Sequence, residues 1–435
     1  MIVPDKVGDG AFDVPYKFFE GILDSDQIRK CIYMKYLVML CDGMADEPNL
    51  ELDNKTPMEL AIKPCMDSLA AKAEVGMVKT VADGMSPGSD VANLAVLGYD
   101  AKKYYSGRSP LEAASIGIDL KDTDVTFRCN LVTLSDEEAY EDKTILDYCA
   151  DDISTEEARV LIEYVQENMG TDEFAFYAGV SYRHCLVWAK GNSTPGKLTP
   201  PHDITGKPIK EYLPTDVAKD VLLPLMERSY NLLKDHPVNL ARIERGKRPA
   251  NSIWLWGEGT KPLLDSFMHL YNLKGSMVSA VDLLKGIAIC AEMSSVDVDG
   301  ATGYIDTNFE GKAKAAMAEF DRGQDLVYIH VEAPDECGHR AEHENKVRSI
   351  ELIDEKVLAP MVEYFKKKGE DFSILVCPDH PTPLVTRTHS REAVPYLIYR
   401  SNAEKQGVEK FTEANASETG IYVAEGYTLM SRFIG

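Results

Sequence analysis

Short apolar runs that end in polar residues alternate along this chain with segments whose apolar residues recur at helical spacing. Residues 35–41, 325–331 and 372–377 are continuous apolar runs of the length typical of buried parallel strands. Helical spacing over residues 64–73 and 344–368 predicts helices that cover these strands. Strands that alternate with helices favour an α/β fold, in which helices flank a mostly parallel sheet.

The pattern changes between residues 122 and 249. A capping box that begins at Ser154 predicts the start of an amphipathic helix. Residues 173–189 predict two strands paired in antiparallel fashion, and residues 215–235 predict a second helix that Pro224 kinks or interrupts. The block therefore predicts a compact α+β unit inserted into the α/β fold.

These patterns divide the chain into three parts. We expect a discontinuous core over residues 34–121 and 250–435, and an inserted domain over residues 122–249. Residues 1–33 are polar and acidic, without a basic segment followed by an apolar one, and we expect an N-terminal arm outside the core. No apolar stretch approaches the length of about 20 residues that spans a bilayer, so no membrane-spanning helix is expected.

Charge and cysteine content narrow the possible partners. The net charge of −24 argues against nucleic acid or an anionic membrane surface as a partner. An anionic substrate would therefore need a local basic pocket. The nine cysteines are scattered and form no Cys-x-x-Cys pair, a pattern that fits a reducing cytoplasm rather than a zinc ribbon or a disulfide framework. Nothing in the sequence indicates an oligomeric state.

Carboxylates and imidazoles follow the predicted strands. They are Asp42 after the first strand, Asp335 and His339 after the strand at 325–331, Asp379 and His380 after the strand at 372–377, and then His389. The carboxyl ends of parallel strands meet at one edge of a sheet, where these groups would stay unsatisfied unless positive charge lay between them. Two divalent cations about 4 Å apart would supply that charge.

Each of these residues alone is equally well explained as a turn aspartate or a surface histidine. The whole set, in register at the strand ends, favours a metal centre over that simpler explanation. His343 competes with His339 for the ligand role, but it lies where the long helix begins and is the weaker candidate. His330, within the strand at 325–331, shows no ligand spacing.

Ser89 follows a Gly/Pro turn and opens a predicted helix. Free N–H groups at a helix N-terminus bind anions, so a serine there is placed to carry phosphate. The simpler explanation is an N-cap serine. Arg108, Arg183 and Lys285 are candidates to hold anionic groups, although a single surface arginine or lysine is usually just solvated.

The ordered motifs resemble the cofactor-independent, or 2,3-bisphosphoglycerate-independent, phosphoglycerate mutases of the alkaline phosphatase superfamily. These motifs are Cys41-Asp-Gly43, Pro87-Gly-Ser-Asp-Val-Ala-Asn-Leu94, Asp335-x-x-Gly-His339, Asp379-His380 and His389. Segments 88–93 and 106–113 narrow the resemblance to the archaeal-type branch. The likeness covers essentially everything from Met34 to the C-terminus.

The resemblance implies an alkaline-phosphatase-like core whose inserted domain acts as a lid over the site. It implies a cytoplasmic enzyme of glycolysis that interconverts 3-phosphoglycerate and 2-phosphoglycerate, a small phosphorylated organic acid, without 2,3-bisphosphoglycerate. It also implies two divalent ions, with Mn²⁺ expected and Mg²⁺, Co²⁺ or Zn²⁺ as alternatives. The implied ligands are Asp335, His339 and His389 for one ion, and Asp42, Asp379, His380 and the Ser89 oxygen for the other.

In this scheme Ser89 accepts the phosphoryl group from the substrate and returns it to the other hydroxyl, while Arg108, Arg183 and Lys285 hold phosphate and carboxylate. Two alternatives stay open. One is a related metal-dependent phosphotransferase or phosphatase on another small phosphate ester, such as the proposed homoserine kinase subgroup. The chain has no P-loop and no kinase-type Gly-rich loop, which favours the mutase. The other is a binding module without activity, which the complete set of proposed ligands disfavours.

Overall fold

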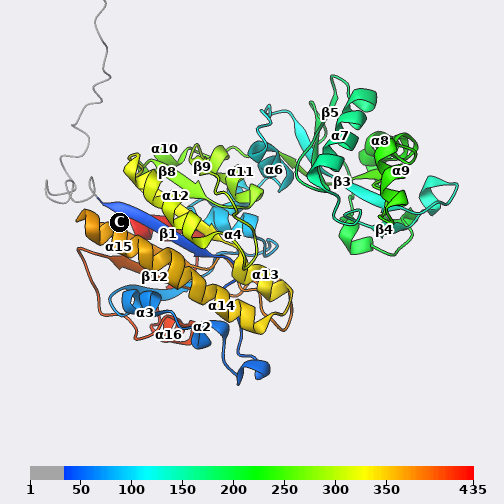
Figure 1. Ribbon diagram of the computed structural model, residues 1–435. Helices are drawn as coiled ribbons and strands as arrows, with labels where there is room; N and C mark the ends of the chain where they lie inside the picture. The colour runs from blue at the N-terminus through cyan, green and yellow to red at the C-terminus, as the bar shows by residue number, and fades with distance from the viewer. Residues whose placement is uncertain (1–33) are drawn as a thin grey trace, which may run out of the picture.

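The computed structural model describes residues 34–435, so the expected N-terminal arm lies outside the described residues. Two lobes are visible in Figure 1: a larger core lobe, whose sheet lies between layers of helices, and a smaller second lobe. The core lobe contains an eight-stranded sheet and the second lobe a five-stranded one. No helix in the described part of the chain is long and apolar enough to cross a membrane.

The core sheet is mostly parallel, as predicted. Strand β1 (Lys35–Cys41) lies at its centre, between β10 (Leu326–Val331) and β11 (Phe372–Cys377), and runs parallel to both. Beyond β10 the sheet continues with β8 (Gly275–Val278) and β9 (Ser294–Val296), again in parallel. Beyond β11 lie the antiparallel β12 (Val394–Arg400), then β2 (Glu74–Val78) and β13 (Tyr422–Val423).

Alternate side chains of β1 pack into two separate cores, because successive side chains of a strand point to opposite faces. Leu37 and Met39 contact one helical layer, which comprises α3 (Pro64–Ala70), α12 (Phe309–Asp321), α14 (His343–Ile353) and α15 (Ala359–Lys368). Val38 and Leu40 contact the other layer, which comprises α4 (Ser89–Val96), α11 (Asp282–Cys290) and α17 (Leu429–Ile434). The central strand is therefore buried on both faces, as its continuous apolar run predicts.

Shorter helices complete the core lobe. They are α2 (Pro57–Leu60), α5 (Ala101–Tyr104), α6 (Ser109–Ser115), α10 (Phe267–Tyr271), α13 (Ala333–His339) and α16 (Glu413–Glu418). The predicted long helix at 344–368 is confirmed, with a π turn at Asp354–Leu358 between α14 and α15. Pro360, near the start of α15, has no N–H to donate to the preceding turn, which accounts for the local change in hydrogen bonding.

The second lobe is an antiparallel sheet with three helices on it. Its strands are β3 (Val125–Leu134), β4 (Ile145–Asp147), β5 (Phe174–Tyr177), β6 (Arg183–Trp188) and β7 (Ser252–Thr260). Its helices are α7 (Thr155–Met169), α8 (Asp216–Leu233) and α9 (Pro237–Glu244). The predicted antiparallel pair β5–β6 is confirmed, and α8 continues through Pro224 without interruption.

The structure differs from the expected boundary at residue 249 for one strand. Residues from 250 onward are expected in the core, but β7 pairs with β3 along most of its length. In the sequence this segment is a short apolar run, residues 253–256, followed by Gly257, and strands of both kinds of sheet share that pattern. We therefore place the second lobe at residues 125–260, and its folding as a separate domain stays a proposal.

Candidate functional site

Three neighbouring strands bring the predicted ligands to one edge of the core sheet. Cys41 is in register with Val331 of β10, and Leu40 with Cys377 of β11. Asp42 therefore follows β1 at the level where β10 and β11 also end, and Asp379 and His380 follow two and three residues after β11. All three side chains are almost completely buried.

The motif after β10 is helical rather than a turn. Asp335 and His339 lie one turn apart on α13, and Asp335 Oδ2 is 3.2 Å from His339 Nε2. Gly338 allows α13 to approach the segment after His380, because a Cβ there would lie 2.5 Å from the carbonyl oxygen of Thr382. A side chain at 338 would push the helix, and with it Asp335, away from the other strand ends.

The ligand atoms form two overlapping groups. Asp335, His380 and His389 each offer an atom within 4.8 Å of the others, and so do Asp42, Asp379 and His380. The nitrogen His339 Nε2 joins the first group, 2.9 Å from His389 Nε2. The six carboxylate and imidazole side chains among the predicted metal ligands are thus together, with His380 between the two groups rather than in one of them.

Ser89 lies at this cluster as the first residue of α4. Its hydroxyl oxygen is 3.1 Å from His380 Nε2. Gly88 is the N-cap residue and makes no side-chain cap, so the simpler explanation of Ser89 as an N-cap serine does not hold. Its hydroxyl is left for the cluster instead of the helix end.

The donor set fits metal ions. His339 Nδ1 and His389 Nδ1 lie 3.0 and 2.9 Å from the carbonyl oxygens of Arg387 and Pro87. A carbonyl only accepts, so each Nδ1 carries a proton, and in the neutral rings that bind metal the two Nε2 lone pairs face each other. Asp42 Oδ1 is buried and has no hydrogen-bond partner among the described residues. Lone pairs and a carboxylate oxygen converging without a donor are what divalent ions satisfy.

The pKa values show the same excess of negative charge. Burial, together with the carboxylates of Asp379 and Asp335, raises the pKa of Asp42 well above its usual range. Burial alone would raise the pKa of Asp335 too, but hydrogen bonds from His339 and His389 hold it well below the usual range. The hydrogen bond to Asp335 raises the pKa of His339 to about 9. In the absence of a cation, a proton on His339 partly fills its place.

Three residues outside the prediction hold the ligands in place. His330 Nε2 is 2.9 Å from Asp42 Oδ2, Asn93 Nδ2 donates to Asp379 Oδ2 over 3.0 Å, and the Thr382 hydroxyl donates to Asp335 Oδ1. His330 shows no ligand spacing in the sequence. Its one available signal is that a histidine stands within a strand whose six residues are all buried, where a polar group needs a partner. His343, the weaker ligand candidate, instead contacts Asn49 and Glu51.

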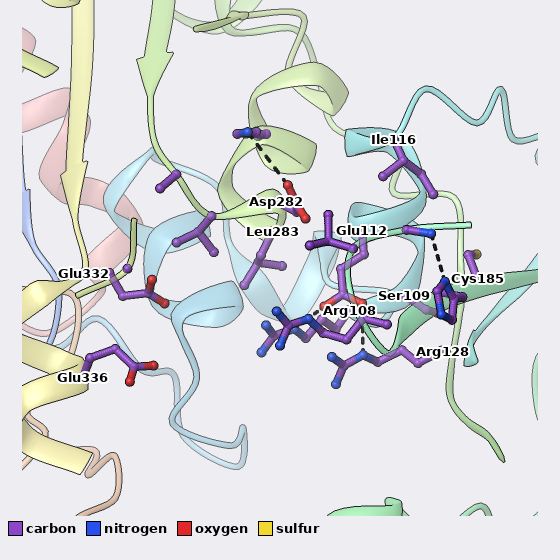
Figure 2. Close-up of a pocket in the computed structure, with 18 of the residues that line it drawn as sticks. Arg108, Ser109, Glu112, Ile116, Arg128, Cys185, Asp282, Leu283, Glu332 and Glu336 are labelled. Carbon is purple, nitrogen blue, oxygen red and sulfur yellow. Dashed lines mark hydrogen bonds and ion pairs between the residues drawn. The ribbon is translucent and has the colours of Figure 1, made fainter. Parts of the chain in front are cut away.

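The predicted substrate-binding residues line a cavity of about 570 Å³ between the two lobes (Figure 2). Arg108 precedes α6, Arg183 begins β6 and Lys285 lies on α11. In the described part of the chain, none of the predicted metal ligands lines this cavity. Glu332, three residues before Asp335, does line it, and its carboxyl group points into the space opposite Arg108.

Charged groups of both signs face one another across the cavity. Burial, followed by the carboxylates of Asp335 and Glu336, raises the pKa of Glu332 to about 8. Lys285 Nζ lies 2.6 Å from Asp297, and Arg183 donates to the Tyr182 hydroxyl over 3.0 Å. The lining therefore combines arginine and lysine with a carboxyl group that is protonated near neutral pH, a suitable surface for a small anion.

Comparison with known proteins connects this geometry to a family. Residues 70–239 match the sequence model described as 2,3-bisphosphoglycerate-independent phosphoglycerate mutase. A protein of that name from Methanosarcina barkeri is 48% identical over 398 residues, covering 91% of this chain and 98% of its own. A probable one from Geobacter sulfurreducens is 47% identical over 402 residues, covering 92% of this chain and 100% of its own.

Solved structures confirm the predicted fold class. A protein from Pyrococcus horikoshii superposes with a TM-score of 0.78 at 26% identity, covering 92% of this chain and 97% of its own. A cofactor-independent phosphoglycerate mutase from Thermoplasma acidophilum superposes with a TM-score of 0.64 at 24% identity, covering 92% and 99%. The second likeness concerns the fold alone.

Proposed function

The chain belongs to the family of 2,3-bisphosphoglycerate-independent phosphoglycerate mutases, and we propose that it interconverts 3-phosphoglycerate and 2-phosphoglycerate through a phosphoserine at Ser89. The observation that supports this mechanism is the place of the Ser89 hydroxyl, 3.1 Å from His380 Nε2 in a buried cluster of carboxylates and imidazoles. A serine there reaches a phosphoryl group that those side chains surround.

Two divalent ions would be held by these side chains. We assign Asp335, His339 and His389 to one ion, and Asp42, Asp379, His380 and the Ser89 oxygen to the other, with His380 adjoining both. When bound, the ions lower the pKa of the Ser89 hydroxyl and neutralise charge on the phosphoryl oxygens. Oxygen and nitrogen ligands accept Mn²⁺, which we propose as the native ion, and also Mg²⁺, Co²⁺ or Zn²⁺.

The reaction proceeds in two transfers at one residue. Ser89 Oγ loses its proton and forms a bond to phosphorus as the bond from phosphorus to the 3-oxygen of the substrate breaks, and the released oxygen takes up a proton. The glycerate then turns within the cavity, and its 2-oxygen loses its proton and takes the phosphoryl group as the bond to Ser89 Oγ breaks and Oγ regains a proton. No 2,3-bisphosphoglycerate is needed, because Ser89 stores the phosphoryl group between the two transfers.

The cavity between the lobes would hold the glycerate during this turn. Arg108, Arg183 and Lys285 line it and supply positive charge for the substrate's anionic groups, against the net charge of −24 on the whole chain. The second lobe acts as a lid that keeps water from phospho-Ser89, since hydrolysis would release phosphate instead of returning it. The cysteines of the described part are all free, which fits the reducing cytoplasm in which glycolysis runs.

The test is an assay of the purified, Mn²⁺-loaded protein on 3-phosphoglycerate, with and without 2,3-bisphosphoglycerate. We expect 2-phosphoglycerate at the same rate in both. Homoserine with ATP, and simple phosphate esters, serve as substrates for the related phosphotransferases and phosphatases. Turnover of one of those without formation of 2-phosphoglycerate would replace the mutase with that activity.

Ser89→Ala tests the phosphoserine. Because Ser89 caps no helix, we expect the variant to fold with a free energy of unfolding within about 1 kcal/mol of wild type, to bind Mn²⁺ and to show mutase activity at background. Ser86→Ala, in the preceding turn, is the matched control and should keep its activity. Mass spectrometry of wild type quenched with substrate should find phosphate on the peptide that contains Ser89. Substantial turnover by Ser89→Ala would mean that the transfer is direct.

A further inference from the structure

Glu112 on α6 binds two arginines that come from different elements. Its Oε1 accepts from Arg108 Nε over 2.8 Å, and its Oε2 accepts from Arg128 Nε over 3.0 Å. Arg108 stands one helical turn before Glu112, whereas Arg128 lies on β3 of the second lobe. Figure 2 shows Arg108, Arg128 and Glu112 among the residues that line the cavity. One carboxylate thus orients both side chains.

The terminal nitrogens of both arginines are left for a ligand. Among residues 34–435, no hydrogen bond or ion pair reaches the Nη atoms of Arg108 or Arg128. The Arg128 side chain is only 13% exposed, and its guanidinium group stacks on the Trp256 ring, 4.3 Å from the ring centre. A Cβ at Gly257 would lie 3.3 Å from Arg128 Cδ, so the glycine keeps this position open.

The charges of this cluster do not balance. Glu112 carries one negative charge, and the two arginines that it binds carry two positive charges. Burial lowers the pKa of Arg128, which is the direction expected for a cation removed from water without enough compensation. A buried excess cation is costly unless an anion meets it.

We propose that Arg128 is a further substrate-binding residue, which with Arg108 holds the carboxylate of the glycerate, and that Glu112 is their positioning residue. This rests on the proposed function. Once the phosphoryl group is on Ser89, the carboxylate is the one anionic group that the glycerate retains, and a planar guanidinium fork matches it in two places. Tyr105 donates to Asp90 over 2.6 Å, which ties the loop before Arg108 to the residue after Ser89.

Loss of this hold has a chemical consequence. If the glycerate departs before the return transfer, a water oxygen attacks the phosphorus of phospho-Ser89, the bond to Ser89 Oγ breaks, and Oγ takes up the proton that the water loses. The products are then D-glycerate and inorganic phosphate in place of 2-phosphoglycerate. The ratio of D-glycerate released to 2-phosphoglycerate formed therefore measures how well the carboxylate is held.

The experiment compares wild type with Arg128→Met, both loaded with Mn²⁺ and freed of excess metal, by calorimetric titration with D-glycerate and with inorganic phosphate. We expect the substitution to weaken D-glycerate binding by about tenfold or more, as removal of charge-assisted hydrogen bonds should. Phosphate binding should change by less than about twofold, because that anion belongs at Ser89. The released fraction of D-glycerate should rise. The control is Arg228→Met, which removes the same charge from an exposed position on α8 and should leave D-glycerate binding, phosphate binding and the released fraction unchanged.

Several results would overturn the proposal. Unchanged D-glycerate binding and an unchanged product ratio would make Arg128 a purely structural residue. A loss of phosphate binding alone would mean that Arg128 holds the phosphoryl group and not the carboxylate. If Arg128→Met does not fold, as judged by circular dichroism, Arg128→Lys replaces it, since one ammonium cannot serve Glu112 and a carboxylate together. If wild type lacks mutase activity but its D-glycerate binding depends on Arg128, the proposed function is refuted and Arg128 is still a carboxylate-binding residue.

Discussion

His339 shows how one residue can serve both the metal-bound and the metal-free site. Its Nδ1 is tied to the Arg387 carbonyl, so only Nε2 is free to take either an ion or a proton. The carboxylate of Asp335, 3.2 Å away, attracts both. Proton and metal therefore compete for the same lone pair, and the strength of that competition follows from the pKa of His339.

We predict a pH dependence of metal binding from this competition. With the pKa of His339 at about 9 in the metal-free protein, against its ordinary 6.5, each ion bound near pH 7 must displace a proton. Apparent Mn²⁺ affinity should thus rise by about tenfold per pH unit up to about pH 9 and then level off. Calorimetry in buffers of different ionisation heat should count about one proton released per ion at this position.

The stability of the metal-free protein depends on pH with the opposite sign to the metal affinity. A raised pKa stabilises the folded state fully below the unfolded value near 6.5, and that stabilisation is lost as pH rises through about 9. The melting temperature of the metal-free protein should therefore fall over this interval, while that of the Mn²⁺-loaded protein should not. Metal affinity independent of pH between 6 and 9 would contradict the assignment of His339 as a ligand.

A second residue-scale prediction concerns His330, which holds Asp42 in place but is not itself a proposed metal ligand. Its Nε2 contacts Asp42 Oδ2, and its Nδ1 contacts the Ser279 hydroxyl, so the ring is fixed at both ends. Outer contacts of this kind are worth about 10- to 100-fold in metal affinity. His330→Leu should weaken Mn²⁺ binding by that factor, measured by titration.

Two comparisons separate positioning from general damage. His330→Gln keeps an amide donor towards Asp42 and should recover part of the affinity. His343→Leu removes a histidine from the start of α14, whose ring contacts Asn49 and Glu51 instead of the cluster, and should leave the affinity unchanged. Equal metal affinity in His330→Leu and wild type would show that Asp42 needs no such support.

At the scale of elements, the sequence predicts well what depends on local pattern. The strands at 35–41 and 372–377 match the structure because both lie almost entirely buried inside the sheet, and the apolar run of each starts and stops with the element. The segment after β10 forms the helix α13, whereas the motif alone is equally compatible with a turn. The spacing of Asp335 and His339 suits metal binding in either conformation. Whether a strand joins one sheet or another depends on pairing with distant residues, so the local pattern does not assign β7 to the second lobe.

An element-scale prediction concerns the junction of α3 with the π turn between α14 and α15. The carboxylate of Asp354 accepts from the Cys65 and Met66 backbone N–H groups, over 3.0 and 2.6 Å, at the first turn of α3. This is the capping that α3 lacks from its own N-cap residue, Lys63. Asp354→Ala should lower the free energy of unfolding by about 1–3 kcal/mol, because one buried and one half-buried donor lose their acceptor.

Glu355→Ala is the matched control, one residue along the same π turn. Its carboxylate pairs with Arg348 at the surface, and such pairs contribute about 0–1 kcal/mol. Urea unfolding of the two variants measures both. Equal stabilities of Asp354→Ala and wild type would show that water replaces the carboxylate at the α3 terminus.

At the scale of the whole molecule, the site draws on residues that the sequence keeps far apart. Arg128 is a single arginine in a strand, without spacing or motif, and its relation to Glu112 and Trp256 exists only after β3 and β7 pair. The metal cluster could be predicted because strand ends of a parallel sheet meet by rule. The cavity between the lobes obeys no such rule, since it depends on how the two lobes face each other.

The last prediction follows from the distribution of the proposed site residues over the two lobes. Ser89 belongs to the core lobe, whereas Arg128 and Arg183 belong to the second lobe, and the metal cluster does not line the cavity in this arrangement. A substrate small enough to be one glycerate must reach Ser89 and these arginines at once, so its binding must draw the lobes together. We expect the radius of gyration from X-ray scattering to fall when 3-phosphoglycerate is added to Mn²⁺-loaded Ser89→Ala, which binds without turnover.

The direction of the change is towards the roughly 22 Å of a single compact body of this length. Arg128→Met in the Ser89→Ala background should reduce the change, because it removes an anchor from the moving lobe. Inorganic phosphate, which engages the core lobe alone, should leave the radius of gyration as it is. If 3-phosphoglycerate also leaves it unchanged while calorimetry shows binding, the substrate is held by the core lobe without closure, and the second lobe cannot be what keeps water from phospho-Ser89.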